Sequence, residues 1–139
     1  MDNTSLSGCW IIDAAHSSWS DGRFPPDMSL RLYLEFTQDR LRYHSENDTD
    51  RTQAVRTLDY DTILDGSTSG LAGSPRFDTV RARQISTLEF EILELLDDDV
   101  IVAAYWRFSE DGRTLWRWGV GKSPLGRSRT YAELFVRKD

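Results

Sequence analysis

The chain has very few of the residues from which metal or redox sites are built. Cys9 is the single cysteine among 139 residues, which excludes an internal disulfide and a CxxC metal motif. Two histidines, His16 and His44, lack the HxH or HxxxH spacing of a zinc site. We therefore expect neither a metal nor another cofactor.

Long hydrophobic runs are absent as well. No 18-residue apolar stretch occurs, and residues 1–7 are short and polar. From this we expect neither export nor membrane insertion and, with no disulfide, a cytoplasmic protein. A net charge of −6 argues against nucleic acid and anionic membranes as partners.

Motifs for nucleophilic or nucleotide chemistry are missing. Residues 70–74 do not form a GxSxG elbow. Residues 119–123 contain Gly-x-Gly-Lys-Ser, but the spacing of a phosphate loop is missing and the segment follows a strand, which favours a β-turn. The acidic run at 97–99 is interpreted as a solvated turn.

What the chain does contain is a series of short strand patterns. Leu30, Leu32, Leu34 and Phe36 alternate with polar residues or tyrosine, a period of two. Between the strand patterns, 14–27 (with one helical turn near 14–18 as an option) and 65–75 are expected to be loops. Predicted strands cover 9–13, 30–36, 41–45, 54–62, 77–85, 88–96, 100–108, 114–120 and 129–136.

The segment 88–96 is the least certain of these strands. Its three glutamates, Glu89, Glu91 and Glu94, would permit a helix, whereas the alternation of Leu88, Phe90 and Ile92 favours a strand. The predicted fold class is all-β: a single domain, residues 1–139, forming one antiparallel up-and-down β-barrel of eight to ten strands. We expect a monomer or a homodimer.

Three motifs support this fold through a family resemblance. Gly8-Cys9-Trp10 opens the first strand, Ser109-Glu110-Asp111-Gly112-Arg113 forms a hairpin, and Val136-Arg137 ends the last strand. In order and spacing they resemble the lipocalin-like (calycin-type) small β-barrels. The resemblance implies that Trp10 packs across the closed bottom of the barrel with Arg137 stacked on it. His16 stands where those barrels usually carry a lysine.

Aromatic residues of the hairpin are the candidate pocket wall. A turn at 109–113 would place Phe108 opposite Thr114 and Trp106 opposite Trp116. One face then carries the ligand-binding candidates Trp106, Trp116, Trp118 and Phe108, and Tyr33, Tyr43 and Phe90 are further candidates. The cluster is interpreted either as core packing or as the wall of a pocket for a small apolar molecule.

Polar candidates come from the last three strands and from the third. Glu133 is expected near Arg117, beside Tyr105 or Tyr131, as an ion pair or as a polar patch at one end of an apolar cavity. The same hairpin pairing would place Tyr105 across from Arg117. The candidate catalytic residues are Arg117, Glu133, Tyr105 and His44.

Three functions remain open at this point. The first is a cofactor-independent cyclase or isomerase of natural-product (specialised) metabolism, because such barrels include enzymes of that kind and positioning alone lowers a barrier. The second is a binding or carrier protein for a small hydrophobic molecule. The third is a barrel filled by its own side chains that acts through its surface.

Overall fold

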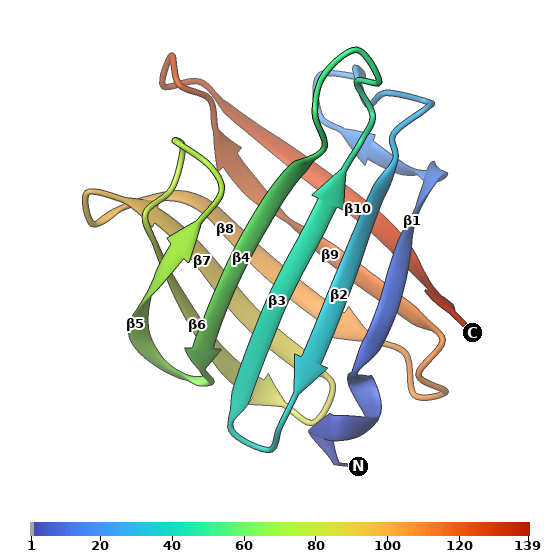
Figure 1. Cartoon of the computed structure of the whole chain (residues 1–139), viewed down its shortest axis with the longest axis vertical. Helices are drawn as coiled ribbons and strands as arrows, with labels where there is room; N and C mark the ends of the chain where they lie inside the picture. Colours follow the sequence, from blue (N-terminus) through green and yellow to red (C-terminus); the bar gives the residue numbers. More distant parts are fainter. Residues whose placement is uncertain (1) are drawn as a thin grey trace.

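The computed structural model describes residues 2–139 and shows one closed antiparallel barrel (Figure 1). Consecutive strands are neighbours, and β1 closes the barrel by pairing with both β2 and β10. The all-β, up-and-down barrel prediction is therefore confirmed. The elements are η1 (Asn3–Leu6), β1 (Gly8–Trp19), β2 (Leu30–Phe36), β3 (Arg40–Asn47), β4 (Arg56–Ile63), β5 (Asp65–Ala72), β6 (Thr79–Ser86), β7 (Glu89–Leu96), β8 (Asp99–Phe108), β9 (Thr114–Lys122) and β10 (Ser128–Lys138).

Two segments predicted as loops are partly strands, so the loop prediction is wrong for 14–19 and 65–72, whereas 20–27 is a loop as predicted. The stretch 65–75 contains β5, which was predicted as a loop because it is rich in Gly and Ser. β5 pairs with β4 at only two positions and shifts register against β6, so a weakly paired strand tolerates residues of low β-propensity. β1 continues through 14–19, and its pairing with β10 shifts between Asp13 and Ser18, a bulge that bends the strand.

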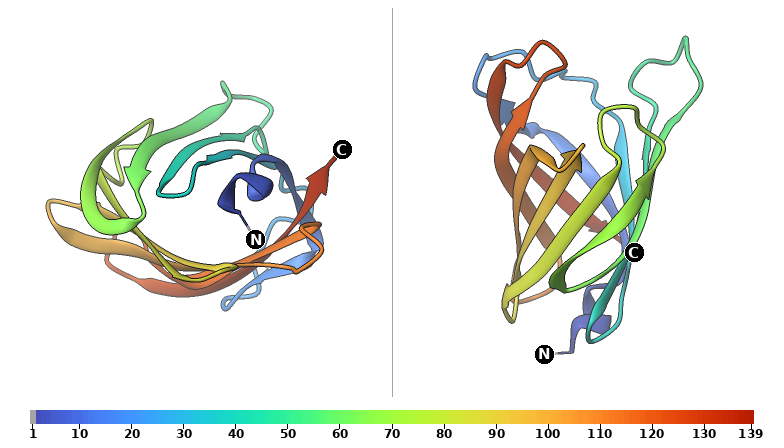
Figure 2. Two further views of the ribbon diagram at one scale, coloured as in Figure 1. Left: turned by 90° about the horizontal axis from the view of Figure 1, so that it is seen from below. Right: turned by 90° about the vertical axis from the view of Figure 1, so that its left-hand side faces the viewer.

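The lower end of the barrel is closed by tight turns and by η1. Leu6 of η1 is fully buried, and Figure 2 shows η1 lying across this opening when the barrel is seen from below. The Asn3 side chain donates to Gln38 O at 3.1 Å and to Gln84 Oε1 at 2.8 Å, and Gln84 Nε2 donates back to Asn3 Oδ1 at 3.0 Å. These bonds fix η1 to the barrel.

Trp10 lies directly above η1, as the family resemblance implied. It is fully buried, its Nε1 donates to Leu6 O at 3.3 Å, and the Arg137 guanidinium lies 5.2 Å from its ring centre. The Trp10 ring meets Phe108 edge-to-face at 5.2 Å. The expected pair of Trp10 and Arg137 at the closed end is confirmed.

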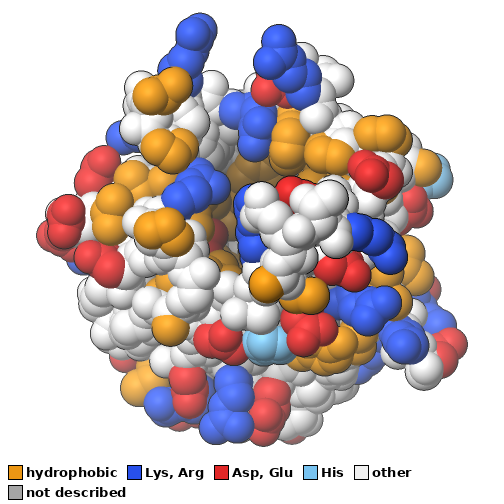
Figure 3. All heavy atoms as spheres, turned by 45° about the horizontal axis from the view of Figure 1, so that its top comes forward, with side chains coloured by type: hydrophobic (Ala, Val, Ile, Leu, Met, Phe, Trp, Pro, Cys, Tyr) orange, Lys and Arg blue, Asp and Glu red, His pale blue; other side chains and the backbone are white. Residues whose placement is uncertain are grey.

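The opposite end carries the longer loops, at 20–29, 48–55, 73–78 and 123–127. The space-filling view from this side shows a hollow between the loops, rimmed by hydrophobic and basic side chains (Figure 3). Among the residues that the structure describes, no helix has the length and apolar character needed to span a bilayer.

The pairing predicted for the hairpin of β8 and β9 is wrong by one residue. Phe108 pairs with Leu115, not Thr114, and Trp106 pairs with Arg117, not Trp116. A one-residue slip moves every side chain of one strand to the opposite face. Trp106 and Phe108 therefore face the barrel interior, whereas Trp116 and Trp118 lie on the outer surface, 41% and 38% exposed.

Candidate ligand-binding site

The inner wall changes character along the barrel, as three cross-strand rows show. The lower row, Phe90, Trp106, Arg117 and Glu133, introduces charge above an aromatic floor. The middle row is Ile92, Ala104, Gly119 and Tyr131, and the row nearest the open end is Glu94, Val102, Gly121 and Arg129. On β8 and β9 the upper rows contain small residues, Ala104, Gly119 and Gly121, which occupy little space above the lower row.

Arg117 and Glu133 form an ion pair inside the barrel. Arg117 Nε donates to Glu133 Oε1 at 2.7 Å, and the side chains are 16% and 9% exposed. Burial is the largest single influence and opposes the charge of Arg117, but Glu133, Tyr43 and Tyr131 together outweigh it and raise the pKa of Arg117 well above its ordinary value. The predicted proximity of these two residues is confirmed, and Arg117 stays a cation.

Tyr43 connects this ion pair to a second aromatic group. Arg117 Nη1 donates to the Tyr43 hydroxyl at 3.2 Å. The rings of Tyr43 and Tyr60 stack in parallel, 4.6 Å apart, and Trp106 lies 6.0 Å from Tyr43. Burial raises the pKa of both tyrosines, so both hydroxyls stay protonated.

Two donors in this group lack an acceptor within residues 2–139. They are the hydroxyl of Tyr60, a residue only 5% exposed, and the indole Nε1 of Trp106, which is fully buried. A buried donor without a partner is costly and rare in folded proteins. Beside the Arg117 guanidinium, these two donors call for an oxygen acceptor that the protein itself does not supply, and because neither atom is exposed in this conformation, neighbouring side chains must move for a ligand to reach them.

Glu94 adds an acid to the same space, and sequence reasoning missed it. Burial raises the pKa of Glu94 to about 7, an effect that Arg117 and Arg76 partly offset. The signal was present in the sequence, because Glu94 continues the alternation of Phe90 and Ile92 to the interior. Tyr60 was missed in the same way: it alternates with Leu58 and Thr62 on β4, so the three share the inner face.

Other predicted site residues lie outside the barrel. Tyr105 pairs with Trp118, not with Arg117, and its hydroxyl donates to Glu89 on the outer face. Tyr33 is exposed on β2 beside His44 of β3, with ring centres 5.6 Å apart. Tyr43, Phe90, Trp106 and Phe108 are the ligand-binding candidates that the structure places in the interior.

His44 is held between two carboxylates on the outer face. Its Nδ1 lies 2.6 Å from Asp59 Oδ1 and its Nε2 lies 3.2 Å from Glu46 Oε2. The hydrogen bond to Asp59, then that to Glu46, raises the pKa of His44. With both nitrogens engaged, His44 has no free nitrogen for a substrate.

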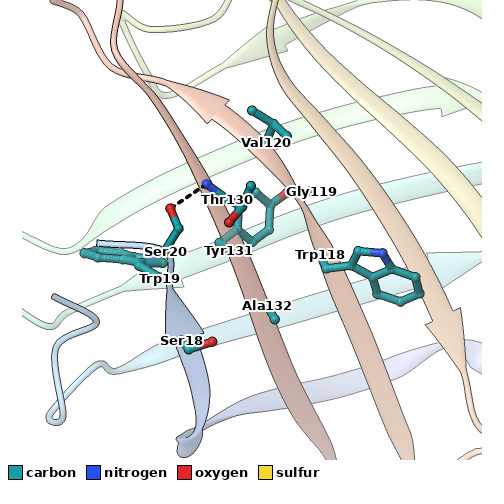
Figure 4. Close-up of a pocket in the computed structure, with 9 residues that line it drawn as sticks. All are labelled: Ser18, Trp19, Ser20, Trp118, Gly119, Val120, Thr130, Tyr131 and Ala132. Carbon is teal, nitrogen blue, oxygen red and sulfur yellow. Dashed lines mark hydrogen bonds between the residues drawn. The ribbon is translucent and has the colours of Figure 1, made fainter. Parts of the chain in front are cut away.

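A groove of about 450 Å³ lies on the outer surface over β1, β10 and β9, where Ser18 and Trp19 pair with Ala132 and Tyr131 (Figure 4). Trp19 and Trp118 lie on opposite sides of β10 along it, and Ser20 Oγ accepts from Thr130 N at 3.0 Å. Trp118 thus borders this outer groove, not the interior. The groove holds neither the ion pair nor the unpartnered donors, so we place the candidate site inside the barrel.

The arrangement defines a class of protein: a closed β-barrel whose buried aromatic cluster suits a small apolar ligand. Within residues 2–139, no three His, Cys, Asp or Glu side chains are grouped to hold a metal ion. In the comparisons with known proteins, no family model matches the chain and no curated protein matches its sequence.

Proposed function

We propose that the barrel binds a small, largely apolar molecule that carries an oxygen acceptor, and holds it for cofactor-independent isomerisation or cyclisation. The observation that carries the proposal is the pair of unpartnered donors, Tyr60 OH and Trp106 Nε1, beside the Arg117 guanidinium. The aromatic floor contributes apolar contact, and the donors orient a carbonyl, hydroxyl or carboxylate oxygen.

We also infer that the chain is a lipocalin-like (calycin-type) barrel that works in the cytoplasm. The closed up-and-down topology and the stacking of Arg137 on Trp10 support the lipocalin-like barrel, and the single free cysteine supports the cytoplasm. Ten strands are at the upper end of the expected range. A carrier without chemistry is the second candidate function, because the same donors would serve binding alone.

Binding inside the barrel is tested with 2-tetralone, an apolar bicyclic ketone, by isothermal titration calorimetry. Gly121 faces the interior near the open end, and a Cβ there would meet only Val102 Cγ2, at 3.6 Å. Gly121→Phe therefore starts without a backbone clash and places a large ring on the inner face between the open end and the row of Trp106 and Arg117. We expect it to weaken 2-tetralone binding at least about tenfold, which is about 1.4 kcal/mol.

The matched control is Val120→Phe, one residue away on the outer face. It adds a similar bulk outside the barrel, and the affinity should not change. Because Val120 lines the outer groove, weaker binding by Val120→Phe alone would place 2-tetralone in that groove. Absence of binding by the wild type would favour a barrel filled by its own side chains.

Tyr60→Phe separates a ligand contact from a structural one. Removing a buried hydroxyl that has no partner leaves the protein as stable as the wild type or slightly more stable. If the hydroxyl holds the ligand oxygen, the affinity falls about fivefold to tenfold, as for one hydrogen bond of about 1 kcal/mol. An unchanged affinity would remove Tyr60 from the site.

A further inference from the structure

Glu94 differs from the other acid of the inner wall in having no fixed partner. Glu133 accepts a hydrogen bond from Arg117 at 2.7 Å, whereas no hydrogen bond or ion pair of Glu94 occurs among residues 2–139. An isolated acid in the interior is disfavoured as a carboxylate unless a charge or ligand compensates it. Glu94 is half-buried, so its carboxyl stays within reach of a molecule that enters from the open end and has no partner in the protein.

Glu94 belongs to the same interior space as the donors. It stands on the inner face of β7, next to Val102 of β8 and closer to the open end than Ile92. After burial, the Glu94 carboxylate is one of the groups that raise the pKa of the hydroxyls of Tyr43, Tyr60 and Tyr131. A molecule resting on the aromatic floor would thus meet donors on one side and the Glu94 carboxyl on another.

The charged and titratable groups that face Glu94 come from several elements. They are Arg117 of β9, Glu133 and Tyr131 of β10, Tyr43 of β3, Tyr60 of β4 and Arg76 of the loop 73–78. The arginines favour the carboxylate, while burial and Glu133 oppose it, which leaves the pKa of Glu94 at about 7. Near neutral pH the group can both take up and release a proton.

Resting on the proposed function, we propose that Glu94 is a catalytic residue, the base and acid that moves a proton on an apolar carbonyl compound with an acidic α C–H. The Glu94 carboxylate takes the α proton, the C–H electron pair forms a C=C bond, and the carbonyl π pair moves to oxygen. Tyr60 and Arg117 donate to the resulting enolate oxygen.

The second half of the reaction restores every group. In this half, the α carbon of the enolate, or a conjugated γ carbon, takes the proton from Glu94. The carbonyl C=O bond re-forms at the same time. The product is the starting compound or its double-bond isomer, and Glu94 returns to the carboxylate. Arg117 has N–H groups for this role, since its bonds to Glu133 and Tyr43 use two of five.

The test is α-deuterium exchange of 2-tetralone in D₂O, followed by ¹H NMR. Wild type should exchange the α protons faster than buffer, with a rate that rises as the pH passes through about 7, where Glu94 ionises. Glu94→Gln keeps the shape but not the base, and should lower the rate about 100-fold or more. Its affinity for 2-tetralone should stay within about threefold, because the donors remain.

Glu91→Gln is the matched control on the same strand, since Glu91 lies on the outer face and pairs with Arg83 at 3.1 Å. It should exchange like wild type, and Glu94→Asp should restore part of the rate. Wild-type protein that binds 2-tetralone without faster exchange, or Glu94→Gln that exchanges normally, overturns the proton-transfer role and leaves the binding proposal standing. Absence of 2-tetralone binding overturns both.

Discussion

The two ends of the barrel are built from the same ten strands but differ in what fills them. The closed end is packed by Trp10, Phe36, Phe108 and Phe135, all buried, and is covered by η1. The open end carries Glu94 and Gly121 beneath long loops, with half-buried Tyr131 one row further in. Burial of large apolar side chains stabilises the fold, while polar groups that are expensive to bury persist where a ligand has access.

The largest expected effect is at the closed end. Trp10→Ala removes a fully buried indole with its contacts to Phe108 and Arg137, and should lower the free energy of unfolding by about 3–5 kcal/mol. Leu58→Ala, near the open end, should cost about 1 kcal/mol, because solvent can fill the space left behind. Urea denaturation measures both, and equal losses would mean that the two ends are packed alike.

The next effect concerns the ion pair between the two ends. Arg117→Met leaves Glu133 without its partner in a largely buried position, and should cost about 3 kcal/mol of stability at neutral pH. The double variant Arg117→Met/Glu133→Leu should recover most of that loss. A double variant as unstable as the single one would show that the loss comes from packing around Phe135, 4.9 Å from the guanidinium.

A smaller effect is expected on the outer face of the same hairpin. Trp118→Ala removes an exposed cross-strand contact with Tyr105, whose ring lies 4.9 Å away, and should cost at most about 1 kcal/mol. Affinity for 2-tetralone should be unchanged, unlike that of Gly121→Phe. If Trp118→Ala abolishes 2-tetralone binding in the calorimeter, the outer groove is the binding site. The open end of the barrel would then not be the place where the ligand binds.

The smallest effect is pH-dependent and lies on the outer surface. Asp59 and Glu46 raise the pKa of His44, so folding favours the protonated ring. This stabilisation is fully present below the unfolded-state pKa of about 6.5 and is lost as the pH rises through the higher folded-state pKa.

Because the ion pairs of His44 are exposed and screened by solvent and salt, the stabilisation from its protonated ring amounts to about 0.2–1 kcal/mol. His44→Gln should therefore be less stable than wild type at pH 5.5 and equally stable at pH 9, by urea denaturation at both values. A difference that persists at pH 9 would assign the effect to ring packing on Tyr33.

The residue patterns within individual strands were sufficient to predict most of the strands and the fold class. The alternation of Leu30, Leu32 and Leu34 defines the buried face of β2 without reference to any other strand. The Trp10–Arg137 pair followed from a family resemblance, and the neighbourhood of Glu133 and Arg117 from the order of the strands. Such features depend on local periodicity and on sequence order, which the sequence contains directly.

Tertiary structure decided the features that depend on how strands meet. A period of two defines two faces, but not which one is inside, and a one-residue difference in the turn exchanged the places of Trp118 and Arg117. β5 exists because its neighbours offer a partner for closure, not because of its own propensity. The isolation of Glu94 is likewise a property of the closed barrel, since only closure determines which side chains it meets.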